Sequence, residues 1–178
     1  VVVVRDQDGT LRAFHNVCRH RAARVMCEPE GECTKLRCRY HGWTYDLAGR
    51  LRGTPEFDGV CEFEKADNGL VPVGAVGEWG PFVWVHLTEP REPLDEFLAP
   101  FPAWAAGRRC FDGLAFAARK EYVLACNWKV YADNYLDGGY HVSTVHPDLA
   151  GVLDYKQYRT ETWDNVSLQS SPLVPAGG

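Results

Sequence analysis

Two short segments of the chain each pair a cysteine with a histidine. One residue separates Cys18 from His20, two separate Cys38 from His41, and seventeen lie between the two pairs. Thiolates and imidazoles are preferred ligands of iron and zinc. A zinc finger groups its cysteines together and its histidines together, whereas here each segment supplies one of each. The spacing therefore indicates a two-iron cluster in which one iron takes two thiolates and the other takes two imidazoles.

This ligation of a [2Fe–2S] cluster is that of a Rieske centre, whose neutral imidazoles raise its potential above that of an all-cysteine ferredoxin. A single Cys or His is more often a buried packing residue. Two pairs in this order, followed by glycine, basic and aromatic residues, favour metal binding. The other cysteines are irregularly spaced and are expected to be reduced thiols rather than ligands: Cys27, Cys33, Cys61, Cys110 and Cys126.

A second candidate metal site involves His141 and His146, with Asp137 four residues before the first histidine. Iron sites that activate oxygen combine two histidines with a carboxylate and keep positions open for substrate and O2. On a regular helix, residues five apart point about 140° away from each other. The two histidines can thus share a metal only if the helix ends or kinks between them, which the Gly138-Gly139 pair before and Pro147 after favour. Taken alone, such residues are more often partly exposed helix-end residues; the upstream cluster, which needs an electron acceptor, favours iron.

Strands are expected to position the first site. Residues 1–90 contain short β-rich runs, with one hairpin turning at Asp8-Gly9 and a second at Ala48-Gly49. Residues 80–89 are rich in β-branched and aromatic residues and predict a further strand. The proline-dense residues 90–102 are expected to connect two units.

A helix is expected to precede the second site. Its apolar residues recur at i, i+3, i+4 and i+7, and Asn127 is suited to cap its N-terminus. The glycine pair weakens the helix at its far end. Residues 160–170 alternate in the manner of a strand. The apolar stripe comprises Trp128, Tyr131, Ala132, Tyr135 and Leu136.

Composition excludes several classes of protein. The chain has 178 residues, 46% of them hydrophobic, which is enough to bury a core. The net charge of −5, with both signs interspersed, argues against a nucleic-acid or anionic-membrane partner. No run of about 18 apolar residues predicts a membrane span. The chain begins in a strand-like Val run without Met and stops without a closing element, so both ends are expected to be cut, and a cytoplasmic location is expected.

Both candidate sites lie in segments that resemble one family. CRHRA and CRYHGWTYDLAGRL resemble the Rieske signature, and NWKVYADNYLDGGYHVSTVH the mononuclear iron motif, of the α subunit of Rieske non-haem iron oxygenases. Within this aromatic-ring-hydroxylating family, DNYLDGGYHV is most similar to choline monooxygenase-like members acting on quaternary ammonium compounds. The resemblance implies an all-β Rieske domain (residues 1–100), followed by the truncated start of an α+β catalytic domain (residues 101–178).

The resemblance also implies roles for the site residues. Three positions are proposed without preference as a substitute third ligand, because the family's carboxylate ligand lies downstream of this chain: Asp148, Asp154 and Asp164. Asp137 is expected to be the catalytic aspartate that links the two centres, although many family members place that aspartate at the position of Gly138. The cluster ligands are Cys18, His20, Cys38 and His41, and two ligands of the mononuclear Fe(II) are His141 and His146.

The function implied is that of a terminal oxygenase. Electrons from NAD(P)H would arrive through a reductase, with or without a ferredoxin, and O2 would hydroxylate a small molecule, choline or another quaternary amine. Family members are usually homotrimers in which the cluster of one subunit serves the iron of its neighbour. The alternatives are a Rieske-type electron-transfer protein, an oxygenase acting on an aromatic acid, and an inactive fragment. Trp43, Tyr40 and Arg21 flank the cluster loops, where they would either shield the cluster and tune its potential or pack around it; packing is favoured for Trp43.

Overall fold

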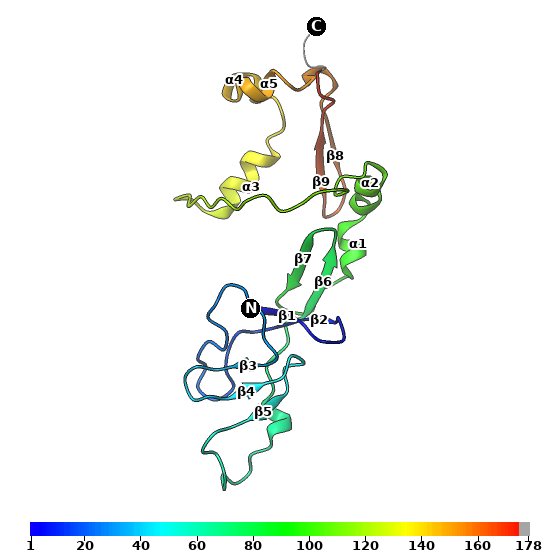
Figure 1. Cartoon of the computed structure of the whole chain (residues 1–178). Coiled ribbons are helices and arrows are strands. Elements are labelled where there is room, and N and C mark those ends of the chain that lie inside the picture. The colour runs from blue at the N-terminus through cyan, green and yellow to red at the C-terminus, as the bar shows by residue number, and fades with distance from the viewer. Residues whose placement is uncertain (175–178) are drawn as a thin grey trace. The chain divides into compact units, whose positions relative to one another are not determined.

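The computed structural model describes residues 1–174 and divides the chain into two compact units, Val1–Leu94 and Asp95–Gly178 (Figure 1). The first unit consists of strands with one short 3-10 helix, whereas the second combines helices with a β-hairpin. This confirms the fold class, an all-β domain followed by the start of an α+β domain. The domain boundary at residue 100 stays a prediction.

The strands of the first unit form small antiparallel sheets. The 3-10 helix η1 (Lys65–Asn68) follows the second sheet, and β2 contacts β6. The pairs and the triplet are β1 (Val2–Arg5) with β2 (Leu11–Phe14), β3 (Leu36–Arg37) with β4 (Thr44–Tyr45) and β5 (Leu51–Gly53), and β6 (Ala75–Trp79) with β7 (Phe82–His86).

Glycines in the left-handed region close both predicted hairpins. Gly9, with φ of 81°, lies in the turn between β1 and β2, and Gly49, also with φ of 81°, lies between β4 and β5. Gly49 is further constrained, because a Cβ there would come within 2.5 Å of the Phe14 ring. Both predicted hairpins are confirmed. The strand expected over residues 80–89 is shorter, because Gly80, with φ of 58°, is part of the turn that precedes β7.

The core of the first unit lies beneath the two cysteine–histidine segments. Trp43, Tyr45 and Leu47 alternate inward along the chain at 2%, 0% and 6% exposure, as residues of one strand face do. This alternation brings aromatic side chains under the segments that carry the candidate ligands. The hydrophobic core of this unit also includes Phe14, Cys18, Val25, Leu36, Cys38, Leu51 and Leu70.

The elements from Leu94 onward include the predicted helix. α3 (Trp128–Leu136) begins as expected at Asn127, whose side chain accepts a hydrogen bond from the Lys129 N–H at 3.0 Å. The remaining elements are α1 (Leu94–Leu98), α2 (Phe101–Gly107), α4 (Val142–Val145), α5 (Pro147–Ala150), the 3-10 helix η2 (Tyr155–Gln157), β8 (Arg159–Thr162) and β9 (Ser167–Ser170).

One expectation for this half needs correction and another needs refinement. Residues 160–170 are not one strand but parts of β8 and β9, which pair antiparallel around a turn at Asp164 and Asn165. Both residue types favour turns because their side chains bond to the local backbone. The boundary between the two units does fall within the proline-dense residues 90–102, as expected, but that stretch also contains α1 and the start of α2. Pro102 is tolerated there because the first turn of a helix leaves its N–H groups without partners.

Within residues 1–174, no helix has the length and apolar character needed to cross a membrane.

Candidate metal centres

The two cysteine–histidine segments form turns of the same kind. In the first, the Cys18 N–H donates to the Ala23 carbonyl at 2.8 Å and the Ala22 N–H donates to the Cys18 carbonyl at 3.0 Å. In the second, the Cys38 N–H donates to the Trp43 carbonyl at 2.9 Å and the Gly42 N–H to the Cys38 carbonyl at 3.0 Å. Each turn thus begins at its cysteine and closes five residues later.

The fifth residue of each turn adopts a left-handed backbone conformation. Gly42 has φ of 75° and Ala22 has φ of 55°. Glycine adopts this conformation freely, whereas alanine does so at a cost of about 1 kcal/mol. The first turn therefore keeps a strained residue next to its ligand segment, and strain of this kind is common at functional sites.

The turns bring the four candidate ligands together as two pairs. Cys18 and Cys38 are 3% and 2% exposed, and their thiols lie close enough for Cys18 to help raise the pKa of Cys38. The rings of His20 and His41 meet edge to face with centroids 4.6 Å apart. Thus the thiols lie side by side in the core and the imidazoles lie side by side nearer the surface.

This pairing fits a two-iron cluster better than a single ion. Among residues 1–174, no three His, Cys, Asp or Glu side chains are gathered closely enough to hold one metal ion. A Rieske cluster needs only two protein ligands on each iron. The buried Nδ1 of His20 has no hydrogen-bond partner. Because buried polar atoms are nearly always paired, that nitrogen is suited to bind a metal.

Burial shifts the titration of both kinds of ligand toward the neutral form. Burial raises the pKa of the Cys38 thiol, although hydrogen bonds from the backbone N–H groups of Tyr40 and His41 oppose it. Burial also lowers the pKa of His20, and the charges of His41 and Arg21 add to that effect. A neutral imidazole is the form that binds a metal.

Two aromatic side chains, Trp43 and Tyr45, contact the candidate ligands. The His20 ring stacks on the Trp43 indole with centroids 4.8 Å apart and planes 7° from parallel. The Tyr45 hydroxyl lies 3.3 Å from the Cys18 sulfur and accepts a hydrogen bond from the Arg19 N–H at 3.1 Å. Sequence reasoning missed Tyr45. The only available signal was its place two residues after Trp43, on the same face of a strand.

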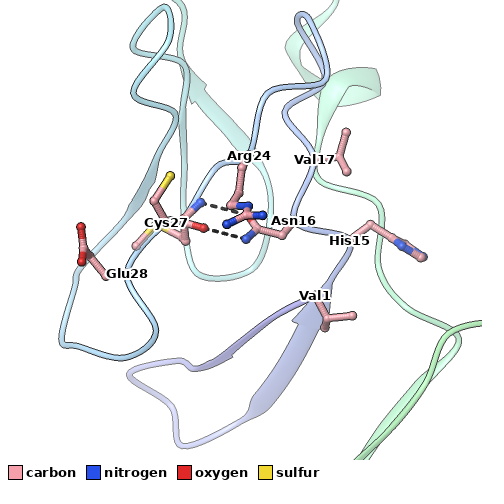
Figure 2. Close-up of a pocket in the computed structure, with 8 residues that line it drawn as sticks. Val1, His15, Asn16, Val17, Arg24, Cys27 and Glu28 are labelled. Atoms are coloured by element: carbon pink, nitrogen blue, oxygen red, sulfur yellow. Dashed lines mark hydrogen bonds between the residues drawn. The ribbon is translucent and has the colours of Figure 1, made fainter. Parts of the chain in front are cut away.

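The side chain of Asn16 forms hydrogen bonds to the backbone segment that follows the first turn. Its side-chain oxygen accepts hydrogen bonds from the N–H groups of Val25 and Met26 at 3.0 and 2.9 Å, and its amide donates to the Met26 carbonyl at 2.7 Å. Asn16 also lines a pocket of about 400 Å³, and Figure 2 shows its side chain among the other lining residues. None of the four candidate ligands lines this pocket, so it is separate from the cluster site.

The second candidate site forms where α3 ends. Asp137 is the C-cap of α3, and Gly138 follows with φ of 80°. His141 and His146 then flank the single turn of α4, and His146 leaves the helical region at φ −125° and ψ 66°. Their ring centroids are 5.5 Å apart. The helix end expected between the two histidines is found at Val145, the last residue of α4, and the rings of His141 and His146 lie close to each other.

Asp137 lies beside the first of these histidines. Its carboxylate is 3.8 Å from Nδ1 of His141, and that nitrogen is buried without a hydrogen-bond partner. A movement of about 1 Å would bring the pair into hydrogen-bonding range and leave Nε2 of His141 for a metal. A hydrogen bond with Asp137 raises the pKa of Tyr140.

No hydrogen bond or ion pair within residues 1–174 joins Asp148, Asp154 or Asp164, the three candidates for a third ligand, to either histidine. Asp148 lies in α5, and Asp164 lies in the turn between β8 and β9. The Asp154 carboxylate accepts hydrogen bonds from the Lys156 N–H at 3.2 Å and from the Gln157 amide at 2.6 Å. Among the described residues, no third metal-binding side chain lies close enough to complete a three-ligand site with His141 and His146. A depression of about 340 Å³ borders His146.

Comparison with known proteins gives each half of the chain a class. Residues 1–64 match the Rieske [2Fe-2S] domain, and residues 111–173 match the catalytic domain of the ring hydroxylating alpha subunit. The two matches together define a class of protein in which an iron–sulfur domain precedes an oxygenase catalytic domain. The chain belongs to the family of Rieske non-haem iron oxygenase α subunits, and this membership implies both a [2Fe–2S] cluster and a mononuclear iron.

Several relatives share most of this chain. A chloroplastic choline monooxygenase of Arabidopsis thaliana is 39% identical over 94% of the chain and 42% of its own length. The glycine betaine monooxygenase oxygenase subunit of Chromohalobacter salexigens is 39% identical over 86% of the chain and 34% of its own length. The crystal structure of the quaternary ammonium Rieske monooxygenase CntA with an inhibitor has a TM-score of 0.88 at 30% identity, covering 98% of this chain and 48% of that one. The chain thus spans less than half the length of these relatives.

Proposed function

We propose that the protein is the terminal oxygenase component of a Rieske oxygenase that hydroxylates a quaternary amine, with choline or a betaine as substrate. The observation that carries the proposal is the meeting of the His141 and His146 rings at a break after α3, in a chain that also holds two paired cysteine–histidine turns. An electron carrier has no use for the first feature. The match of residues 111–173 to an oxygenase catalytic domain argues in the same direction.

The cluster would be held by Cys18 and Cys38 on one iron and by His20 and His41 on the other. The adjacent buried sulfurs and the unpartnered His20 nitrogen support this assignment. The cluster supplies one-electron transfer at a potential raised by its imidazole ligands. His41 is exposed, so its ring edge is available to a partner.

The mononuclear iron would be held by His141 and His146, with a carboxylate from outside this stretch as its third ligand. The greater length of the relatives supports a ligand from outside this stretch. When bound, the iron supplies the chemistry of O2 activation. Because His146 leaves the helical region at the end of α4, its ring approaches that of His141 with centroids 5.5 Å apart.

Asp137 is proposed as the catalytic link between the centres. Its position 3.8 Å from His141 Nδ1 supports a role in accepting a hydrogen bond from that imidazole and in holding a proton there. In a trimer, the same carboxylate would accept a hydrogen bond from a cluster histidine of the neighbouring subunit. Such a carboxylate orients both rings and provides a short path between them.

The partners and location are proposed on the same basis. A reductase that oxidises NAD(P)H, with or without a ferredoxin, would supply electrons, and three copies of the chain would assemble so that each cluster serves a neighbour. A cytoplasmic location is supported by the seven free cysteines, since reduced thiols persist in a reducing compartment. The chloroplastic relatives make a plastid-like compartment the alternative to test.

The experiment that tests the function compares substrates. The protein extended to its natural C-terminus is reduced by a generic reductase under O2, and product formation is measured with choline, glycine betaine, carnitine and a set of aromatic acids. Oxidation of a quaternary amine is expected. Oxidation of aromatic acids alone would keep the family and contradict the substrate class, and uncoupled electron flow without any product would contradict oxygenase function.

A further inference from the structure

The residues of the proposed iron site have little core of their own. Every residue of α3 is at least partly exposed, and Val142 is the buried residue of α4. Yet the turn between these helices must hold Asp137 and His141 in a fixed relation. Catalytic groups must be held within about 0.5 Å of their productive positions by the side chains packed around them. The support for this turn must therefore come from another element.

The β8–β9 hairpin makes that contact. The side-chain amide of Gln169, in β9, donates a hydrogen bond to the backbone carbonyl of Tyr135 at 3.0 Å. Tyr135 lies in the last turn of α3, where carbonyl groups lack partners within the helix. Tyr158, immediately before β8, donates its hydroxyl hydrogen bond to the side-chain oxygen of Gln169. Both the amide nitrogen and the oxygen of the Gln169 side chain are thus hydrogen-bonded.

The ring of Tyr158 also contacts the turn itself. A Cβ placed on Gly139 would come within 2.6 to 2.9 Å of three atoms of that ring. Gly139 is buried, and its carbonyl accepts the hydrogen bond from the Val142 N–H at 3.0 Å that begins α4. The two glycines therefore act differently: Gly138 provides the left-handed conformation, whereas Gly139 provides room for an aromatic ring.

We infer that Tyr158 and Gln169 are positioning residues that brace the end of α3 and the start of α4, so that the imidazole of His141 faces that of His146. The inference rests on the proposed function, because it assigns these residues to the proposed iron site. The path runs from Gln169 to the end of α3, and from the Tyr158 ring through Gly139 to the first hydrogen bond of α4.

The test measures Fe(II) at this site in the protein extended to its natural C-terminus. Dissociation constants for the mononuclear Fe(II) are determined by titration after selective removal of that iron, and the EPR spectrum of its nitric oxide complex is recorded. Tyr158→Phe keeps the ring and removes the hydroxyl, and Gly139→Ala introduces the clash. Each is expected to weaken Fe(II) binding by about tenfold and to broaden the EPR signal, with the cluster retained.

Two matched variants serve as controls. Tyr155→Phe removes the hydroxyl of a nearby tyrosine, and Gly107→Ala adds a methyl group where no atom lies within 4 Å. Both are expected to bind Fe(II) as the wild type does. A smaller residue at position 158 should relieve the clash, so Gly139→Ala is expected to cost less in a Tyr158→Leu background than alone.

The outcomes separate this inference from the proposed function. A wild-type protein that binds no mononuclear iron would contradict both. Normal binding by the wild type, with unchanged affinity and EPR signal in both Tyr158→Phe and Gly139→Ala, would contradict the brace alone. If Gly139→Ala does not fold, Tyr158→Phe decides the question, because loss of one hydroxyl leaves the packing of its ring intact.

Discussion

The hydroxyl of Tyr45 lies 3.3 Å from the sulfur of Cys18, at the bottom of the first ligand turn. Tyr45 is fully buried and also accepts a hydrogen bond from the Arg19 N–H. An acceptor role toward the backbone leaves the hydroxyl proton to point at the sulfur. Hydrogen bonds to a ligand sulfur stabilise the reduced form of a cluster and so raise its potential.

Tyr45→Phe should therefore lower the reduction potential of the cluster. A hydrogen bond worth about 1 kcal/mol corresponds to roughly 40 mV for a one-electron couple. The measurement is a redox titration followed by EPR of the reduced cluster. Tyr40→Phe is the control, because Tyr40 is 64% exposed in the second turn. A shift equal in the two variants would show that the bond to Cys18 has no special effect.

Trp43→Ala should destabilise the first unit. The indole is 2% exposed, stacks on the His20 ring and meets the Phe57 ring edge to face. Removing a buried aromatic side chain costs about 3–5 kcal/mol. Urea denaturation followed by the visible circular dichroism of the cluster reports this unit specifically. Tyr40→Ala should change the midpoint little, and a similarly small change for Trp43→Ala would contradict the packing described.

The Asp46 carboxylate should stabilise the β4–β5 hairpin in a pH-dependent way. Burial acts to raise its pKa, but hydrogen bonds from Arg50 and Arg52 outweigh burial and lower it. Because the folded-state pKa lies below the unfolded value of about 4, the stabilisation is present above that pH and is lost as pH falls through the folded pKa.

Asp46→Asn isolates this charge, since Asn keeps an oxygen for the Arg50 N–H. The variant should be less stable by about 1 kcal/mol at pH 7, and the difference should shrink below pH 4. Urea midpoints at several pH values provide the measurement, with the exposed Asp58→Asn as control. A difference that persists at low pH would show that the effect is not electrostatic.

Asp137→Ala should keep both metal centres and lose coupled turnover. The carboxylate is 3.8 Å from His141 but is the cap of a helix rather than part of a core. Iron analysis and single-turnover electron transfer from cluster to iron are the two measurements. Asp133→Ala, on the exposed side of α3, is the control. Unchanged electron transfer in Asp137→Ala would remove this residue from the link.

Local chemistry made the ligand turns and their hairpins predictable from sequence. Gly9 and Gly49 mark turns because a left-handed residue is needed there, and Gly138 marks the helix break for the same reason. The helix after Asn127 followed from its apolar period, and its start from a capping side chain. These features depend on residues within a few positions of one another.

Contacts distant in sequence could not be predicted in this way. The approach of Tyr158 to Gly139, and of Gln169 to Tyr135, depends on how a hairpin packs against a helix end. Residues 160–170 also have an alternation that suits one strand or two, and only the Asp164-Asn165 turn decides between them. Tyr45 resembles any core tyrosine until its hydroxyl is placed beside Cys18.

The most direct test of two separate iron sites is an iron count on the protein extended to its natural C-terminus. About three irons per chain are expected, two in the cluster and one at the histidine pair. About two irons, with an intact cluster spectrum, are expected in both His141→Ala and His146→Ala. Two irons in the wild type, unchanged in either variant, would contradict the presence of two separate iron sites.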